Sequence, residues 1–307
     1  MCMKYKMYKP VKPSFLGKKI LNHIDPLPVV QRIDWHYLFL AWKINGKYEG
    51  LETLCDCEAC KVKWLSKFSL EEQLKAQEAY NLLRDAKEIL RIGFEEKRFD
   101  ISAMVFFSEA NGNDEGIFLL ENGMKKFFLP MLRQQNPGER TDCFVSLADF
   151  IAPSDDYIGI FALTVHGADQ WAEELHQKGD DYQSLLVKSV ADRLAEATSV
   201  WLHEKIGEEF WGYAPITHAK GIRPAFGYPS IPDLSMLFEA NKIINLSDIG
   251  IHLTENGAMK PNASICALHI AHPQAFYFMV GQIGVDQKKS YAQHRNMTVE
   301  ELERWLV

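Results

Sequence analysis

The sequence predicts an α+β protein, a single domain in which a mostly antiparallel sheet is flanked by helices. Two long stretches, 69–93 and 181–210, have the apolar spacing of amphipathic helices. Short runs rich in β-branched and aromatic residues lie between them, as is typical of strands. These runs are not interleaved with helices of crossover length, so a doubly wound parallel sheet is not expected.

The N-terminal part is predicted to begin irregularly and then to become helical. Four prolines interrupt residues 1–30, and residues 1–13 are expected to form a separate arm. The apolar run 29–42 fits either a helix or a buried strand, because its spacing does not distinguish the two. At the start of the helix 69–93, Ser69 and Glu72 have the spacing of a capping box.

Five β-rich runs are predicted before the second long helix. They read ISAMVFFSE, GIFLLE, KKFFLP, CFVSLADFI and YIGIFALTV. Asn-Gly turns separate the first three, which is typical of a meander. No GxGxxG motif follows a strand, so the sequence lacks the signature of the common dinucleotide-binding fold.

The second long helix carries a polar row. Asp192, Glu196, Ser199 and His203 fall on one helix face. Such a row is usually the solvent-facing side of a helix, and the alternative is that it lines a cleft. The cleft is a serious alternative because a stiff loop, GIRPAFGYPSIPD at 221–233, follows closely. Its three prolines exclude a helix or a central strand.

The C-terminal part is predicted to contain one helix, two β-like runs and two short terminal helices. The run SMLFEANKIINLSDIGIHL is predicted to form a helix and then a turn, and the β-like runs are NASICALHIAHP and FYFMVGQIGVDQ. Thr298 and Glu301 have capping-box spacing for the last helix.

Composition restricts the class of protein. The 307 residues are 47% hydrophobic and 24% charged, as in ordinary globular domains. A net charge of -7 does not favour nucleic acid as a partner. Neither a signal-peptide pattern nor an apolar run of about 18 residues is seen, so a cytoplasmic protein without a membrane span is expected. Its cysteines are expected to be reduced thiols.

Three of the six cysteines form a cluster, LCDCEACKVKW, with Cys55, Cys57 and Cys60. Zinc and iron–sulfur sites usually take four ligands, and no fourth is evident nearby. A buried or capping thiol cluster is therefore preferred and no metal site is expected. A metal-binding regulatory protein built on these cysteines stays open as an alternative.

The chain resembles the C-terminal activation domain of cobalamin-dependent methionine synthase. The matching segments span nearly everything from about residue 14 to the end, in the family's order. They are IDWHYLFLAW, LADFIAP, DDYIGIFALTV, DDYQSLLVKSVADRLAEATSVWLHEKI, WGYAP, GIRPAFGYPSIPD, LTENGAMKPNAS, HPQAFYFMVGQIGVDQ and MTVEELERWL. The resemblance implies one domain, 14–307, with a strongly bent, largely antiparallel sheet. The cysteine-rich segment near 52–68 looks like an insertion.

The resemblance also implies an activity. The family binds S-adenosylmethionine in a shallow groove and supports reductive methylation of cob(II)alamin to methylcobalamin, which reactivates the methionine synthase. The homocysteine, folate and cobalamin modules do not fit into 307 residues, and no DxHxxG motif is present. A freestanding methyltransferase component is therefore expected, with cobalamin carried by the cobalamin-binding module of a separate methionine synthase. The alternative is a non-catalytic partner that clamps that module or senses S-adenosylmethionine.

A flavodoxin-type electron donor is implied as a second partner. Such a donor is acidic, so its docking face on this chain should be locally basic. Lys43 and Lys47 are the candidates for that face. No catalytic residue is expected, because a cobalt nucleophile and a sulfonium leaving group need positioning rather than a base.

Three charged residues match ligand-binding positions of the family. Asp34 matches the carboxylate for the ammonium group, although a helix cap is an equally good reading of the sequence alone. Arg223 matches the guanidinium that holds a carboxylate through two bonds. Glu196 matches an acid near the ligand, with the solvent-facing row as its alternative.

The remaining candidates belong to the stiff loop and to an aromatic pair. Pro224, Ala225, Gly227 and Tyr228 are expected to form a preordered wall beside the adenine, which reduces the ordering cost of binding. Tyr277 and Phe278 match a family pair that is commonly Tyr-Tyr, so a side-chain hydrogen bond at 278 is lost. Both rings could instead belong to the sheet core.

Overall fold

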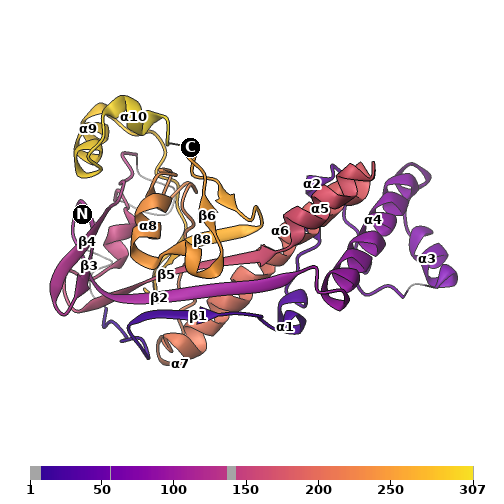
Figure 1. Ribbon diagram of the computed structural model, residues 1–307, viewed down its shortest axis with the longest axis horizontal. Coiled ribbons are helices and arrows are strands. Elements are labelled where there is room, and N and C mark those ends of the chain that lie inside the picture. The colour runs from indigo at the N-terminus through magenta and orange to yellow at the C-terminus, as the bar shows by residue number, and fades with distance from the viewer. Residues whose placement is uncertain (1–7, 56, 137–142, 307) are drawn as a thin grey trace.

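A six-stranded sheet occupies the middle of the molecule (Figure 1). The computed structural model describes residues 8–55, 57–136 and 143–306. The strand order is β4-β3-β2-β5-β8, with β1 also paired to β2, and every pair is antiparallel. The strands are β1 (Gly17–Leu21), β2 (Asp100–Gly112), β3 (Gly116–Glu121), β4 (Met124–Pro130), β5 (Asp156–His166) and β8 (Ser264–His269). The predicted α+β class is confirmed.

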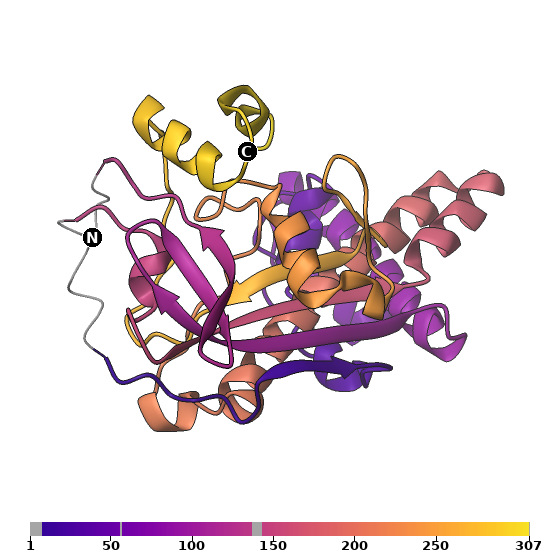
Figure 2. The same cartoon turned by 60° about the vertical axis from the view of Figure 1, so that its left-hand side comes forward.

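The long strand β2 changes partners along one edge. Residues 103–107 pair with β1, whereas residues 109–112 pair with β3. Figure 2 shows the β3–β4 hairpin turned away from the direction of β2. The sheet is therefore bent. Its two faces are covered by different parts of the chain.

Each face of the sheet has its own core. Along β2, Val105 and Phe107 belong to one cluster of buried side chains, whereas Met104 and Ala110 belong to the other, as strand alternation requires. The first cluster includes α4 (Leu70–Glu95) and α6 (Asp181–Lys205); the second includes α8 (Met236–Ile244).

Shorter elements complete the chain. The helices are α1 (Pro26–Val30), α2 (His36–Ala41), α3 (Glu58–Leu65), α5 (Ala168–Gln177), α7 (Ala214–Thr217), α9 (Val285–His294) and α10 (Val299–Glu303). Two short 3₁₀ helices are η2 (Leu147–Phe150) and η4 (Leu246–Ile249). One short π-helix is η3 (Ile206–Phe210), which follows α6 directly. A second small sheet pairs β6 (His252–Leu253) with β7 (Met259–Lys260). None of the helices among the described residues is long and apolar enough to cross a membrane.

Local sequence signals correctly predict where α4 and α10 begin, and α6 also begins at a capping residue. The capping boxes of Ser69 with Glu72 and of Thr298 with Glu301 both form. Asp180 caps α6, because its carboxylate accepts from the Gln183 amide at 3.0 Å. The ambiguous run 29–42 falls across two short helices, α1 and α2.

Three predictions of local structure are wrong. Strand β1 lies within residues 1–30, where irregular backbone was expected, because the proline-free stretch 17–21 pairs with β2. The run CFVSLADFI forms no strand, and its second half contains a capped turn, η2. The run FYFMVGQIGVDQ contains no strand, and a side chain, Gln134, bonds its Met279 carbonyl at 2.8 Å.

The N-terminal arm is described from Tyr8 onwards; the rest of the predicted arm lies outside the described residues. The Tyr8 hydroxyl donates to Asp156, and the Trp211 indole donates to the Val11 carbonyl at 2.7 Å. The expectation of reduced cysteines is wrong for Cys143, which is disulfide-bonded. The free cysteines among the described residues are Cys55, Cys57, Cys60 and Cys266.

Candidate functional site

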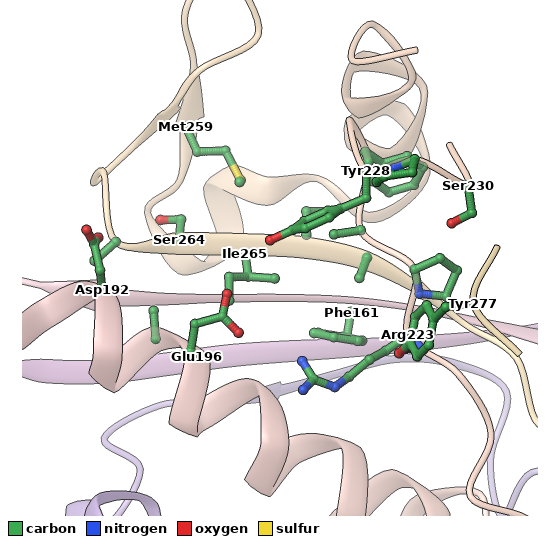
Figure 3. Close-up of a pocket in the computed structure, with 18 of the residues that line it drawn as sticks. Phe161, Asp192, Glu196, Arg223, Tyr228, Ser230, Met259, Ser264, Ile265 and Tyr277 are labelled. Atoms are coloured by element: carbon green, nitrogen blue, oxygen red, sulfur yellow. Dashed lines mark hydrogen bonds between the residues drawn. The ribbon is translucent and has the colours of Figure 1, made fainter. Parts of the chain in front are cut away.

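A groove of about 840 Å³ lies between α6, the loop 221–233, the beginning of β8 and the segment 277–279 (Figure 3). Its volume is within the range of small-molecule sites. It is shallow, because the rings of Tyr228 and Tyr277 line it while 55% and 57% of their areas stay exposed.

The stiff loop is fixed to the sheet through its backbone. The Leu268 amide donates to the Pro224 carbonyl at 3.0 Å, and Ala225 makes a β-bridge with Ala267. On the other side, the Val280 amide donates to the Pro229 carbonyl at 2.9 Å. This wall of the groove is therefore ordered before any ligand arrives.

Gly227 serves the loop rather than the groove lining. Its φ of +84° is in the region that favours glycine, and its amide donates to the Ile231 carbonyl at 2.9 Å. A Cβ added there would lie 3.0 Å from Leu234 Cδ1. The residue closes the tight turn that places Tyr228 over the groove.

Arg223 enters the groove with its side chain oriented by α6. Its guanidinium donates to the Ser199 hydroxyl, and its backbone amide donates to the Tyr277 hydroxyl at 2.9 Å. A guanidinium carries five donors, so further bonds to a ligand remain open to it. The Tyr277 hydroxyl likewise accepts one bond and can donate another.

Two carboxylates lie on the α6 side of the groove. Asp192 and Glu196 both line it, one helical turn apart, while Arg223 approaches from the other side (Figure 3). Desolvation by the surrounding protein raises the pKa of Asp192 above its usual value, and the positive charge of Arg193 opposes that rise. Burial and the charge of Glu196 raise the pKa of Tyr228. The groove thus offers both charge signs to one ligand.

The polar row on α6 faces the groove and the protein beneath it. Asp192 and Glu196 are in the lining, Ser199 bonds Arg223, and His203 has a buried Nδ1 without a hydrogen-bond partner. The row therefore lines a cleft at Asp192 and Glu196, although Asp192 is also exposed to solvent. The proximity of the proline-rich loop was the signal.

Two uncharged histidines lie under Arg223. Burial and the positive charge of Arg223 lower the pKa of His203 to about 4. Burial also lowers the pKa of His269 well below its usual value, with His203 and Arg223 as further causes. The His269 Nε2 is 2.9 Å from the Tyr213 hydroxyl. At neutral pH Arg223 therefore carries the positive charge next to these two neutral histidines. The polar row predicted from the sequence included His203 but missed His269.

Seven of the nine predicted ligand residues line the groove. They are Glu196, Arg223, Pro224, Ala225, Tyr228, Tyr277 and Phe278. Gly227 supports the turn, and Asp34 lies outside the lining, where its Oδ1 accepts from the His36 amide at 3.0 Å as α2 begins. Phe278 also packs on Phe150 with ring centroids 6.4 Å apart, so it belongs to both the core and the groove.

The wall opposite the loop was not predicted. Met259 of β7, Asn262 of the β7–β8 connection, and Ser264 and Ile265 of β8 complete the lining. The Asn262 amide is held by Asp169 at 2.9 Å, a contact across 93 positions of sequence. The matching segment LTENGAMKPNAS was the available signal, but it gave no indication of which side chains face inwards.

Comparisons with known proteins agree on one family. The sequence matches the family described as vitamin B12 dependent methionine synthase, activation domain, over residues 27–296. The fold is similar to a crystal structure of the MetH reactivation domain bound to AdoHcy, with a TM-score of 0.84 and 30% sequence identity. That match covers 98% of this chain and 92% of the other.

Proposed function

This chain belongs to the vitamin B12 dependent methionine synthase activation domain family, and on that premise we propose that it binds S-adenosylmethionine in the groove and presents its methyl group to reduced cobalamin on a separate polypeptide. The observation that carries the proposal is a preformed groove with the Arg223 guanidinium on the loop side and, on the α6 side, the carboxylates of Asp192 and Glu196 beside Arg193. The similar MetH domain is bound to AdoHcy, the molecule left when S-adenosylmethionine loses its methyl group.

The charges of the groove match those of the ligand. S-adenosylmethionine carries a carboxylate, an ammonium group and a sulfonium. We assign the ligand carboxylate to Arg223, which can hold it through two parallel bonds while Ser199 fixes the guanidinium. We assign the cationic sulfonium region to Glu196, with Asp192 adding negative potential.

The ligand's adenine is assigned to the loop side. Backbone groups of 224–228 and the rings of Tyr228 and Tyr277 provide flat surfaces and hydrogen-bonding groups there. Asp34 stays a family-based candidate for the ammonium group, although its carboxylate accepts from the His36 amide and is outside the lining.

The chain's contribution to the reaction is positioning. S-adenosylmethionine supplies an electrophilic methyl group, and the cobalt centre of the partner accepts it. The residues of the groove need only hold the donor in one orientation and leave the methyl accessible. A shallow groove suits this task, because a corrin-bearing protein must approach from outside.

Labelled methyl transfer tests this proposal. The complete chain is mixed with methyl-labelled S-adenosylmethionine, a one-electron reductant and a separate cobalamin-binding module, and label on cobalamin is measured. We expect label only when all four components are present. Binding of S-adenosylmethionine without transfer to any cobalamin module would instead support the non-catalytic sensor or clamp.

A matched variant connects transfer to the groove. Arg223→Lys keeps the positive charge but loses the planar pair of donors, so we expect weaker binding and slower transfer at subsaturating S-adenosylmethionine. Transfer that is as fast as in the wild type in both Arg223→Lys and Arg223→Ala would place the methyl donor elsewhere on the chain.

A further inference from the structure

Three cysteines gather at the beginning of α3, apart from the groove. The ligand atoms of Cys55, Cys57 and Cys60 all lie within 4.8 Å of one another. All three are free thiols, and Cys55 and Cys57 are exposed. Figure 1 shows α3 at one end of the molecule, beside α4, and far along its long axis from α8 and β8.

Local structure brings two of the sulfurs together. Cys57 is the N-cap residue of α3, and its Sγ accepts a hydrogen bond from the Cys60 amide at 3.3 Å. The spacing Cys-x-Cys-x-x-Cys then places the Sγ of Cys55 3.1 Å from that of Cys57. The convergence therefore follows from a short stretch of sequence and one helix start.

The backbone that carries these thiols is anchored to the body of the protein. Trp64 of α3 is buried, and its indole donates to the Glu49 carbonyl at 3.0 Å. Lys87 of α4 donates to the Glu52 carbonyl at 2.8 Å. Both flanks of the cluster are held, so its three sulfurs are positioned rather than randomly close.

The sulfur spacing suits a single ion. Tetrahedral zinc with Zn–S bonds of about 2.3 Å requires thiolates about 3.8 Å apart. The three sulfurs lie within 4.8 Å of one another, and those of Cys55 and Cys57, which are 3.1 Å apart, need only a small separation to reach that spacing. In a [4Fe–4S] cluster each cysteine binds a different iron, so the cysteine sulfurs lie farther apart than around a single zinc ion. Thiolates select soft d¹⁰ ions over magnesium or calcium.

We propose that Cys55, Cys57 and Cys60 bind one zinc ion through three thiolates. Three protons leave the thiols on binding. Among the described residues this group supplies three ligands, so the fourth position is taken by water or another exchangeable ligand. The bound ion joins the 51–57 loop to α3 and so stabilises the segment. This inference does not depend on the proposed function.

Metal titration of the complete chain tests the site. Reduced, metal-free protein is titrated with zinc against a chromophoric chelator, and cobalt(II) is substituted to observe thiolate charge-transfer bands. We expect one equivalent, a thiolate-type cobalt spectrum and a higher melting temperature with zinc. Cys55→Ser, Cys57→Ser and Cys60→Ser should each weaken zinc binding by about 100-fold or more, since ligand loss exceeds the effect of losing an outer contact.

The control is Cys266→Ala, which removes a buried thiol of β8 and should bind zinc normally. Melting of each metal-free variant shows whether it is folded. Folded wild-type protein that binds no stoichiometric zinc overturns the proposal, as does a Cys57→Ser variant that binds as tightly as wild type. Binding of copper(I) alone, or an iron–sulfur chromophore in the purified protein, would overturn the assignment to zinc.

Discussion

The groove and the cysteine cluster are built in opposite ways. The groove combines α6, the loop 221–233 and β8, and its key contact joins Arg223 to Ser199 across 24 positions. The cluster is contained in six consecutive positions and depends on one helix N-terminus. The first is a product of tertiary packing, whereas the second is mainly local.

This difference has a practical consequence. A substitution beneath the groove should act on both stability and S-adenosylmethionine binding, because the same contacts hold the wall and orient the ligand groups. A substitution in the cluster should act on metal binding and leave the groove intact. The predictions below test that separation, beginning with the largest expected effect.

The folding stability of the protein should decrease at acidic pH because of the partly buried histidine His203 beneath the groove. The folded-state pKa of His203, about 4, is below the usual value of 6.5, so the unfolded chain takes up the proton first as pH falls. The stability contributed by neutral His203 is complete above pH 6.5 and is lost towards pH 4. The pKa difference corresponds to about 3 kcal/mol. His269 and Arg223 add to the effect, and Glu204 opposes it.

Urea unfolding of metal-free wild type and His203→Gln at pH 7, 5.5 and 4 measures this effect. We expect the wild type to lose about 3 kcal/mol more than the variant over that range. Using metal-free protein excludes any contribution from the cysteines. Parallel stability curves would show that His203 titrates as it does in the unfolded chain.

Loss of the Arg223 side chain should be the most damaging change to binding. Hydrogen bonds to charged groups contribute about 1.5–3 kcal/mol, so Arg223→Ala should weaken S-adenosylmethionine binding by about 10- to 150-fold. Calorimetric titration measures it. Zinc binding by the same variant should be unchanged, and a parallel loss of zinc affinity would contradict the independence of the two regions.

A substitution of Asp34 tests whether the ligand-binding site extends beyond the residues that line the groove. An asparagine side-chain oxygen can accept the same bond, so Asp34→Asn removes charge while keeping the bond from the His36 amide at the start of α2. If Asp34 holds the ligand's ammonium group, binding should weaken by about 3-fold or more while unfolding stays unchanged. Unchanged affinity would leave the bond to the His36 amide as its role, and Asp34→Ala should then cost only about 1 kcal/mol of stability.

How far the sequence predicts this molecule depends on the range of the contacts involved. Capping boxes are complete within four residues, so Ser69 and Thr298 were placed correctly. The run CFVSLADFI, 143–151, was misjudged as a strand because the local capping box of Ser146 with Asp149 was overlooked, and buried Asp149 also pairs with Arg133, a partner 16 positions away.

The same rule applies to the candidate site. A continuous motif, RPAFGY, predicted most of the loop wall. Met259 and Ser264 were missed because they flank the β7–β8 connection, which is held by Asp169 from another part of the chain. The charged row of α6 could be listed from sequence, but only packing decides which side of it faces the ligand.

The smallest predicted effect concerns the electron donor, and it tests a surface that belongs to neither region. Lys43 and Lys47 are exposed just after α2. Reversing both charges should slow reduction by an acidic flavodoxin-type donor a few-fold at low salt, with less effect at high salt, because steering by exposed charges is screened. Lys125→Glu with Lys289→Glu makes the same change of charge at exposed sites on β4 and α9. Stopped-flow reduction rates that fall equally in both pairs would show that net charge, rather than a docking face beside α2, governs the encounter.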